Sequence, residues 1–244
     1  MHYAEHPIPA ALSGLVTAIW SLEGDGAPSA RIAHDATPDG CIELIRRLRG
    51  RSWWDGEQPE RFAAGLSETP VQFTMSGDAA FVGIRMWPWT WAMLGGPAAP
   101  AFAGRWTAIG PASVAGTILD HPDGLDDALA AALADRDPGP IGGAIAAADS
   151  VAAIVAASGR PHRAVQRWFA DIVGMPPRRY LRLIRFRIAM LDLPDAATTL
   201  ADHASATGFA DQAHMARDFR ALAGIPPREA RGRAVGPFLP GDED

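Results

Sequence analysis

The sequence contains no lysine and a single cysteine, and arginine supplies all 22 of its basic residues apart from histidine. One cysteine, Cys41, excludes a framework of disulfides within the chain and is typical of a protein from a reducing compartment. We interpret Cys41 as a small buried hydrophobic residue rather than as a reactive thiol. Arginine can bind phosphate and guanine through two parallel hydrogen bonds, but we attribute the absence of lysine to genomic base composition.

Long apolar runs are missing as well. None approaches the roughly 18 residues that a membrane-spanning helix needs, and the first residues lack the basic and apolar regions of a secretory signal. We therefore expect a cytoplasmic protein without a membrane partner. With 244 residues, of which 48% are hydrophobic, the chain has enough material for one large or two ordinary domains, each with its own core.

Motifs of catalysis are absent too. The sequence has no Gly-x-Ser-x-Gly elbow, no glycine loop that cradles phosphate and no dinucleotide fingerprint. A metal site needs several imidazole or carboxylate ligands that converge, whereas the histidines of the first half are scattered, at His2, His6, His34 and His121. The sequence therefore predicts no catalytic residues, no metal and no cofactor.

Charge is distributed unevenly along the chain. Residues 1–148 hold 9 Arg and 17 acidic residues, residues 149–234 hold 13 Arg and 8 acidic residues, and the last ten residues add three acidic ones. The net charge of −6 thus hides a basic segment behind an acidic one. This asymmetry is expected if only the later segment contacts phosphate groups.

The basic segment contains an internal repeat. Residues 158–177 and 208–227 both begin with a Gly turn, continue as a short helix and end in Gly, one further residue and Pro-Pro. Aligning the two ends places Phe169 on Phe219 with a period of 50 residues. Gly takes the left-handed turn that stops a helix, and Pro cannot donate to the helical ladder. Two copies indicate two small helical modules rather than a solenoid.

Each repeat predicts a helix with one apolar and one polar face. In the second copy, Asp211 can cap the helix start with its side chain, and Met215, Phe219 and Leu222 recur at helical spacing. Arg, Gln and His residues fall on or near the opposite side, and the first copy follows the same plan. A short helix of this kind meets the requirements of a reader of the DNA major groove.

These motifs resemble the two helix-turn-helix units of the AraC/XylS family of transcription regulators. The resemblance covers about residues 149–233, and Pro161 stands where the family usually has a Ser cap. It implies an all-α domain of two units joined by a long helix, which binds double-stranded DNA in the major groove. The positions that carry it are Gly159, Val165, Gln166, Arg167, Phe169, Gly174, Pro177, Tyr180, Arg185, Ala189, Gly208, Phe209, Asp211, Gln212, His214, Arg217, Phe219, Gly224 and Pro227.

Groove chemistry suggests which side chains of this domain contact DNA. Arg can pair with guanine and Gln with adenine through two hydrogen bonds each. We predict that bases are read by Arg163, Gln166 and Arg167 in the first unit and by Gln212, His214 and Arg217 in the second. Phosphate contacts position a protein without specifying a sequence. We assign them to Arg160, His162, Arg178, Arg179, Arg182 and Arg220, while the resemblance gives Arg185 a structural role.

The first half of the chain is predicted to be mainly β-strand. Leu15–Leu22, Cys41–Leu48 and Ala79–Met86 are short, rich in branched residues and bounded by turn residues, which suggests a small barrel or sandwich. The sequences at residues 37–45, 83–86 and 93–96 resemble the cupin-like sensor half of one AraC subgroup. In that subgroup a Pro-Gly pair usually precedes the third sequence, and here a Trp-Pro-Trp-Thr-Trp segment stands instead, so no ligand preference is carried over.

Five of the eight tryptophans fall in two clusters of this half. An indole offers a flat apolar face and one N–H donor, which suits a pocket for an apolar or cationic small molecule. Ordinary core filling is the alternative use of the same residues. Arg85 either pairs with Glu43 or orients a ligand. The candidate pocket residues are Trp53, Trp54, Arg85, Trp87, Trp89 and Trp91.

Together these observations predict an α+β protein in three parts. Residues 1–137 form a β-rich, cupin-like sensor and dimerisation domain with trailing helices from about residue 114, residues 138–235 form the DNA-binding domain, and residues 236–244 form a disordered acidic tail. We expect a sequence-specific transcription regulator, an activator or a repressor, controlled by a small molecule bound to the N-terminal domain. RNA polymerase and a second copy of the chain are further candidate partners.

An alternative keeps the DNA-binding domain and makes the N-terminal domain catalytic, with a modifying or repair activity. A reactive cysteine in a basic setting or a cluster of metal ligands would favour this alternative. The sequence displays neither of them.

Overall fold

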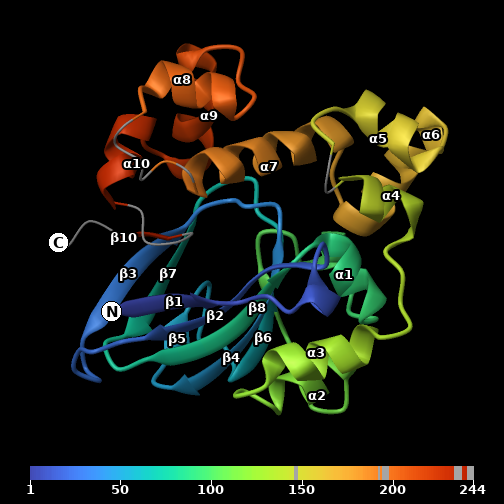
Figure 1. Ribbon diagram of the computed structural model, residues 1–244. Helices are drawn as coiled ribbons and strands as arrows, with labels where there is room; N and C mark the ends of the chain where they lie inside the picture. The colour runs from blue at the N-terminus through green and yellow to red at the C-terminus, as the bar shows by residue number, and fades with distance from the viewer. Residues whose placement is uncertain (146–147, 192, 194–197, 234–237, 241–244) are drawn as a thin grey trace.

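The computed structural model describes residues 1–145, 148–191, 193, 198–233 and 238–240. Strands dominate the first part of the chain, and helices make up most of the second (Figure 1). The long helix α7 (Pro177–Leu191) runs beside the sheets and joins two groups of shorter helices. This order confirms the predicted α+β class. No helix in the described ranges is long and apolar enough to cross a membrane.

Two antiparallel sheets form the N-terminal domain, in the orders β1-β2-β8-β4-β6-β9 and β10-β3-β7-β5. The first sheet consists of β1 (His2–His6), β2 (Val16–Glu23), β8 (Ala80–Met86), β4 (Ile42–Arg49), β6 (Arg61–Ala64) and β9 (Trp106–Ala108). The second sheet consists of β10 (Phe238–Pro240), β3 (Arg31–Ala36), β7 (Val71–Ser76) and β5 (Ser52–Trp53). The three strands predicted from the sequence are β2, β4 and β8, each displaced by one residue at its start.

The turn before β4 forms for the reason that the sequence indicates. The carboxylate of Asp39 accepts a hydrogen bond from the backbone N–H of Cys41 (2.9 Å), and Gly40 takes a φ of +75°. Asp tolerates such a bond to the backbone two residues on, and Gly adopts positive φ without steric cost. The turn places Asp39 at the end of the space between the two sheets.

The chain end departs from the predicted disordered tail. Phe238–Pro240 form β10, which pairs antiparallel with β3 and sets Leu239 opposite Asp35. An edge strand offers unpaired backbone groups to any segment that can reach it, and this long-range pairing is invisible in the local composition. The other residues of the predicted tail lie outside the described ranges.

Short helices close the N-terminal domain. They are η1 (Ala10–Leu12), α1 (Pro88–Met93), η2 (Ala99–Phe102), α2 (Val114–Leu119) and α3 (Leu125–Leu133). Helix α2 is held to the first sheet by Arg46, which donates to the carbonyl of Leu119 (2.6 Å), and by an ion pair between Arg61 and Asp120 (2.6 Å). The helices that trail the strands therefore pack on the N-terminal domain.

The C-terminal part contains two groups of short helices at the two ends of α7 (Figure 1). The first group is α4 (Gly139–Ile145), α5 (Val151–Ser158), α6 (His162–Trp168) and the π-helical turn η3 (Phe169–Val173). The second group is α8 (Leu200–Ala206), α9 (Gln212–Ala223) and α10 (Pro227–Arg233). One buried hydrophobic cluster runs from the first sheet through α1 into both groups.

Candidate DNA-binding surface and sensor cavity

The first helix-turn-helix unit consists of α5, the turn at Gly159 and α6. The hydroxyl of Ser150 accepts a hydrogen bond from a first-turn N–H of α5 (3.2 Å), and Gly159 ends that helix with a φ of +63°. Pro161 precedes α6 and gives no side-chain cap, as its replacement of the usual Ser implies. Val165 and Phe169 are fully buried, so the opposite face of α6 is left to solvent.

All three predicted base readers of this unit lie on that solvent face. Arg163, Gln166 and Arg167 are exposed, and so are Arg160 and His162 at the start of the helix. Helix α6 continues into the π-helical turn η3, which brings the next apolar residues onto the core. The unit thus presents a short row of Arg, Gln and His side chains above an apolar base.

The second unit repeats this plan with better caps. Asp211 accepts a hydrogen bond from the N–H of His214 (2.6 Å) at the start of α9, and Gly224 ends the helix with a φ of +75°. Both predictions from the sequence are confirmed. Phe219 is fully buried, as is its repeat partner in the first unit. The other apolar residues of the predicted face, Met215 and Leu222, are buried beside it.

Of the four residues of α9 that are predicted to contact DNA, three face solvent and one is half-buried. Gln212, Arg217 and Arg220 are exposed. His214 is half-buried, because its ring packs edge-on against Phe209 with 5.3 Å between the ring centroids. Its Nε2 also lies 3.8 Å from a carboxylate oxygen of Asp218. The structure therefore gives His214 contacts inside the unit, in contrast to the other predicted readers.

The three arginines of α7 that are predicted to contact phosphate differ in their contacts within the protein. Arg178 is exposed, whereas Arg179 pairs with Glu68 of the N-terminal domain (3.2 Å). Arg182 Nε donates to Asp218 Oδ1 at 2.9 Å. Two of the three predicted phosphate contacts on this helix are thus engaged in ion pairs within the protein.

Asp218 anchors the second unit to α7. Its side chain is 7% exposed, and its second carboxylate oxygen has no hydrogen-bond partner among the described residues. Arg185 lies 4.0 Å from that oxygen and stacks over Phe209 at 5.1 Å. Arg185 thus has the structural role that the family resemblance implies, and Arg182 shares it.

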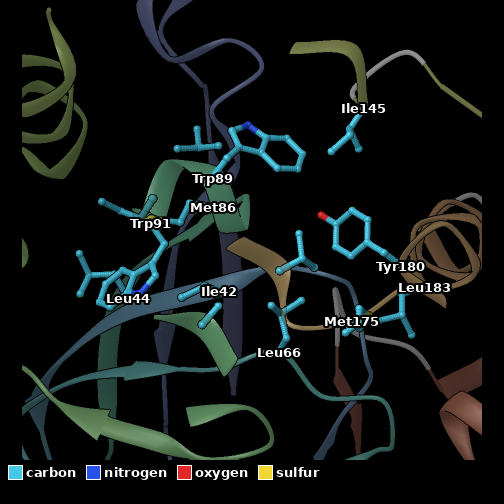
Figure 2. Close-up of a cluster of buried hydrophobic side chains, with 14 of the residues drawn as sticks. Ile42, Leu44, Leu66, Met86, Trp89, Trp91, Ile145, Met175, Tyr180 and Leu183 are labelled. Carbon is cyan, nitrogen blue, oxygen red and sulfur yellow. The ribbon is translucent and has the colours of Figure 1, made fainter. Parts of the chain in front are cut away.

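The first unit packs directly on the N-terminal domain. Trp89 of α1 lies 6.1 Å from Trp168 and 6.5 Å from Tyr180, measured between ring centroids. Figure 2 shows Trp89 and Tyr180 in one cluster with Ile145 and Met175 from the C-terminal part. The Trp87–Trp91 segment therefore fills an interface between the two parts of the chain.

Two neighbouring residues of α7 contact loops of the N-terminal domain. The hydroxyl of Tyr180 donates to the buried carbonyl of Gly40 (3.0 Å). Arg179 reaches Glu68 on the loop after β6. Burial raises the pKa of Tyr180 well above its usual value, so the hydroxyl keeps the proton that it donates.

A cavity of about 120 Å³ lies between the two sheets, close to these same loops. One wall comes from β2, β4, β6 and β8, the other from β3, β5 and β7. The loops at Thr37–Asp39 and Gly65–Ser67 line its end. The lining residues are Trp20, Leu22, Ala36, Thr37, Pro38, Asp39, Glu43, Ile45, Ser52, Trp54, Gln58, Phe62, Ala64, Gly65, Ser67, Val71, Phe73, Met75 and Phe81.

A buried ion cluster stands beside the cavity. Arg85 Nε lies 2.8 Å from Glu43 Oε1 and 3.0 Å from Asp39 Oδ2, and its Nη1 lies 3.1 Å from Glu5 Oε1. Tyr3 accepts a hydrogen bond from Nη2 at 3.2 Å. Burial raises the pKa of Glu43 above its usual value, and Arg85 offsets part of that shift. Of the two roles predicted for Arg85, the structure supports the ion pair.

The predicted ligand pocket needs correction. Of its six residues, Trp54 lines the cavity and the other five do not. Trp53 packs against the guanidinium groups of Arg31 and Arg51, at 3.7 and 5.1 Å from the ring centroid. Trp91 is buried, donates to the carbonyl of Pro97 (2.8 Å) and packs within the core. Strand and helix direction, which composition does not reveal, turn these indoles away from the space between the sheets.

The two signals that would favour a catalytic N-terminal domain are a reactive cysteine and a cluster of metal ligands. Burial raises the pKa of the Cys41 thiol to about 12, and the Asp39 carboxylate adds to the shift. A thiol of this kind is inert. In the described ranges no group of three or more His, Cys, Asp or Glu side chains is placed to hold a metal ion.

Sequence reasoning missed most of the cavity residues. Val71, Phe73 and Met75 alternate on β7, and Trp20 and Leu22 alternate on β2. A period of two marks the face that points to the interior. It cannot distinguish a filled interior from a hollow one, because that depends on side chains from all the facing strands.

Two helix-turn-helix units joined by one helix, each with exposed arginine beside glutamine, define a double helix-turn-helix DNA-binding protein. Residues 154–233 match the family described as "Helix-turn-helix domain", and residues 4–105 match the family described as "Domain of unknown function (DUF6597)". Residues 154–233 are thus an AraC-type helix-turn-helix DNA-binding domain behind a DUF6597 domain, and the chain is a DNA-binding transcription regulator of this type. The resemblance stated from the sequence is confirmed.

Solved structures give more distant matches. A transcriptional regulator with an AraC-type DNA-binding domain from Chromobacterium violaceum is 23% identical, with 38% of this chain and 89% of that chain covered and a TM-score of 0.36. ToxT from Vibrio cholerae is 8% identical, with 95% and 98% covered and a TM-score of 0.47. ToxT with a bound unsaturated fatty acid is 11% identical, with 86% and 92% covered and a TM-score of 0.45. No curated protein matches the chain.

Proposed function

We propose that this regulator reads a bipartite DNA site with α6 and α9, and that a small molecule in the cavity between the two sheets controls the reading. The observation that carries the control is the position of α7. Its residues Tyr180 and Arg179 hold the loops at Gly40 and Glu68, next to the loop residues that line the end of the cavity. A ligand that shifts either loop acts on the helix that joins the two DNA-binding units.

For base reading we propose the exposed residues of the two helices. These are Arg163, Gln166 and Arg167 on α6 and Gln212 and Arg217 on α9. His214 positions α9 and does not read a base in this proposal, since its ring packs on Phe209 and its Nε2 lies near Asp218. Phosphate contacts come from exposed Arg160, His162, Arg178 and Arg220, because charges at the rim of the surface reach the backbone without entering the groove.

Arg179 and Arg182 take a different part in the proposal. Their ion pairs with Glu68 and Asp218 set the geometry of α7, so they act on the spacing of the two reading helices and not on a phosphate. Two such helices on a rigid connector can enter successive major grooves, about 34 Å apart on one face of DNA.

Selection from a randomised DNA pool with the full chain, at two salt concentrations, tests this proposal. We expect enrichment of one site with two half-sites about ten base pairs apart. Arg167→Ala and Arg217→Ala should each lose preference in one half-site. Arg105→Ala removes the same charge from an exposed position on the N-terminal domain and should keep both half-sites. Binding without sequence preference would reduce the interaction to phosphate attraction and contradict the proposal.

A further inference from the structure

We propose that the cavity between the sheets accepts a compact organic cation, a protonated amine on a body of about one ring, with Glu43 and Asp39 as its anionic partners. This inference rests on the proposed function, because it names the chemical class of the molecule that occupies the cavity. Two features of the walls lead to it: their charge and their aromatic surface.

The charge of the cavity wall is negative. Its described lining contains two carboxylates, Asp39 and Glu43, and no arginine or histidine. Arg85 lies behind these carboxylates and pairs with both of them and with Glu5. One guanidinium therefore faces three carboxylates, and the cluster keeps an excess of negative charge beside the cavity. An opposite charge within a few ångströms favours the ionised form of a buried carboxyl group, so a bound cation stabilises this cluster and a bound anion is repelled.

The remaining lining is apolar and largely aromatic. Trp20, Trp54, Phe62, Phe73 and Phe81 surround the space. Aromatic faces attract cations through the negative electrostatic potential above the ring. The volume of about 120 Å³ is somewhat below that of the engineered cavity of about 150 Å³ known to hold benzene. These dimensions suit one ring or an equivalent short aliphatic body.

The experiment compares three probes of equal size and different charge: benzylamine, benzyl alcohol and benzoate. Binding to the full chain without DNA is measured by titration calorimetry at neutral pH. We expect benzylamine to bind at least about tenfold more tightly than benzyl alcohol, since a charge-assisted hydrogen bond is roughly twice as strong as a neutral one. Benzoate should bind more weakly than both. Benzoate binding as tightly as benzylamine would overturn the inference.

Variants test whether the preference for the amine arises in the cavity. Glu43→Gln should abolish the preference for the amine over the alcohol. Glu57→Gln is the matched control, because Glu57 is an exposed carboxylate that pairs with Arg51 outside the cavity. Should Glu43→Gln fail to fold, Ala64→Leu takes its place: it fills the cavity from β6 and should remove binding of all three probes. A preference that survives either change refutes the site.

This result is separable from the proposed function. If the full chain selects a bipartite DNA site and yet binds no amine, the amine assignment fails and the regulator stands. If it binds benzylamine in the cavity but selects no DNA site, the DNA-reading proposal fails and the amine assignment stands.

Discussion

The ion pair between Arg182 and Asp218 gives the sharpest test of how the two DNA-binding units are held together. Sequence reasoning places Arg182 on a phosphate, whereas its Nε donates to a buried carboxylate at 2.9 Å. Asp218 accepts this hydrogen bond through Oδ1, and its Oδ2 has no hydrogen-bond partner among the described residues. Arg182→Ala would leave a buried carboxylate near Arg185 and His214 but without any hydrogen bond.

The magnitude follows from the burial of the two partners. Breaking a fully buried pair from one side costs about 3–5 kcal/mol, and breaking an exposed pair costs about 0–1 kcal/mol. Here Asp218 is 7% exposed and Arg182 is 40% exposed. We therefore expect Arg182→Ala to lower the opening free energy of the second unit by about 2 kcal/mol, or about 30-fold in its opening equilibrium. Asp218→Ala removes the buried charge itself, so the double variant should be no less stable than Arg182→Ala alone.

Native-state hydrogen exchange at the amides of α9 measures that opening free energy without assuming that the whole chain unfolds in one step. The matched control is Arg178→Ala, an exposed arginine on the same helix, which should leave exchange unchanged. The same two variants should show the reverse contrast in the salt dependence of DNA binding. Arg178→Ala should reduce the salt slope by about one, and Arg182→Ala should leave the slope intact. Unchanged exchange in Arg182→Ala, together with a reduced slope, would refute the structural role and restore the phosphate contact.

Three further predictions use single positions. Tyr180→Phe removes the hydroxyl that donates to the buried carbonyl of Gly40 and should destabilise the docking of α7 by about 1–3 kcal/mol. Amide hydrogen exchange in β4 and α7 should then be faster, and unchanged exchange would contradict the prediction. Gly224→Ala places a side chain at a φ of +75° where no other atom crowds it, so it should cost about 1–2 kcal/mol through backbone strain alone. The control Gly143→Ala lies within α4 at an uncrowded position and should instead stabilise by up to about 1 kcal/mol through helix propensity; thermal denaturation measures both. The pKa of Cys41 is raised to about 12, and only the thiolate reacts with iodoacetamide. The alkylation rate should therefore rise about tenfold for each pH unit between 7 and 10, whereas a plateau near pH 9 would indicate an ordinary thiol.

Local signals predicted the helices and their ends well. Asp211 and Gly224 act as the caps that their chemistry indicates, and the repeat places Phe169 and Phe219 at the same buried position. Caps and stops depend on residues within four positions of each other. A single sequence contains everything that such features need.

Long-range features could not be predicted in the same way. The pairing of Arg182 with Asp218 spans 36 residues, and the contact of Tyr180 with Gly40 spans 140. The Trp cluster at residues 87–91 illustrates the difficulty, because its composition fits a pocket and an interface equally well. Helix α1 turns Trp89 toward Trp168 and Tyr180, and only the packing of a distant segment settles that choice.

The repeat itself explains why the two units differ in what they contact. Trp168 and Asp218 occupy the same position in the 50-residue period, one residue before the buried phenylalanine of each unit. In the first unit this position carries an aromatic ring, which packs against Trp89 and so fixes the unit to the N-terminal domain. In the second unit it carries a carboxylate, which pairs with Arg182 and so fixes the unit to α7. An indole at position 218 would leave Arg182 and Arg185 without their anion, and an aspartate at position 168 would face the apolar surface of α1. The residue at this one repeat position thus fixes the first unit to the N-terminal domain and the second unit to α7, while both units keep exposed Arg and Gln side chains.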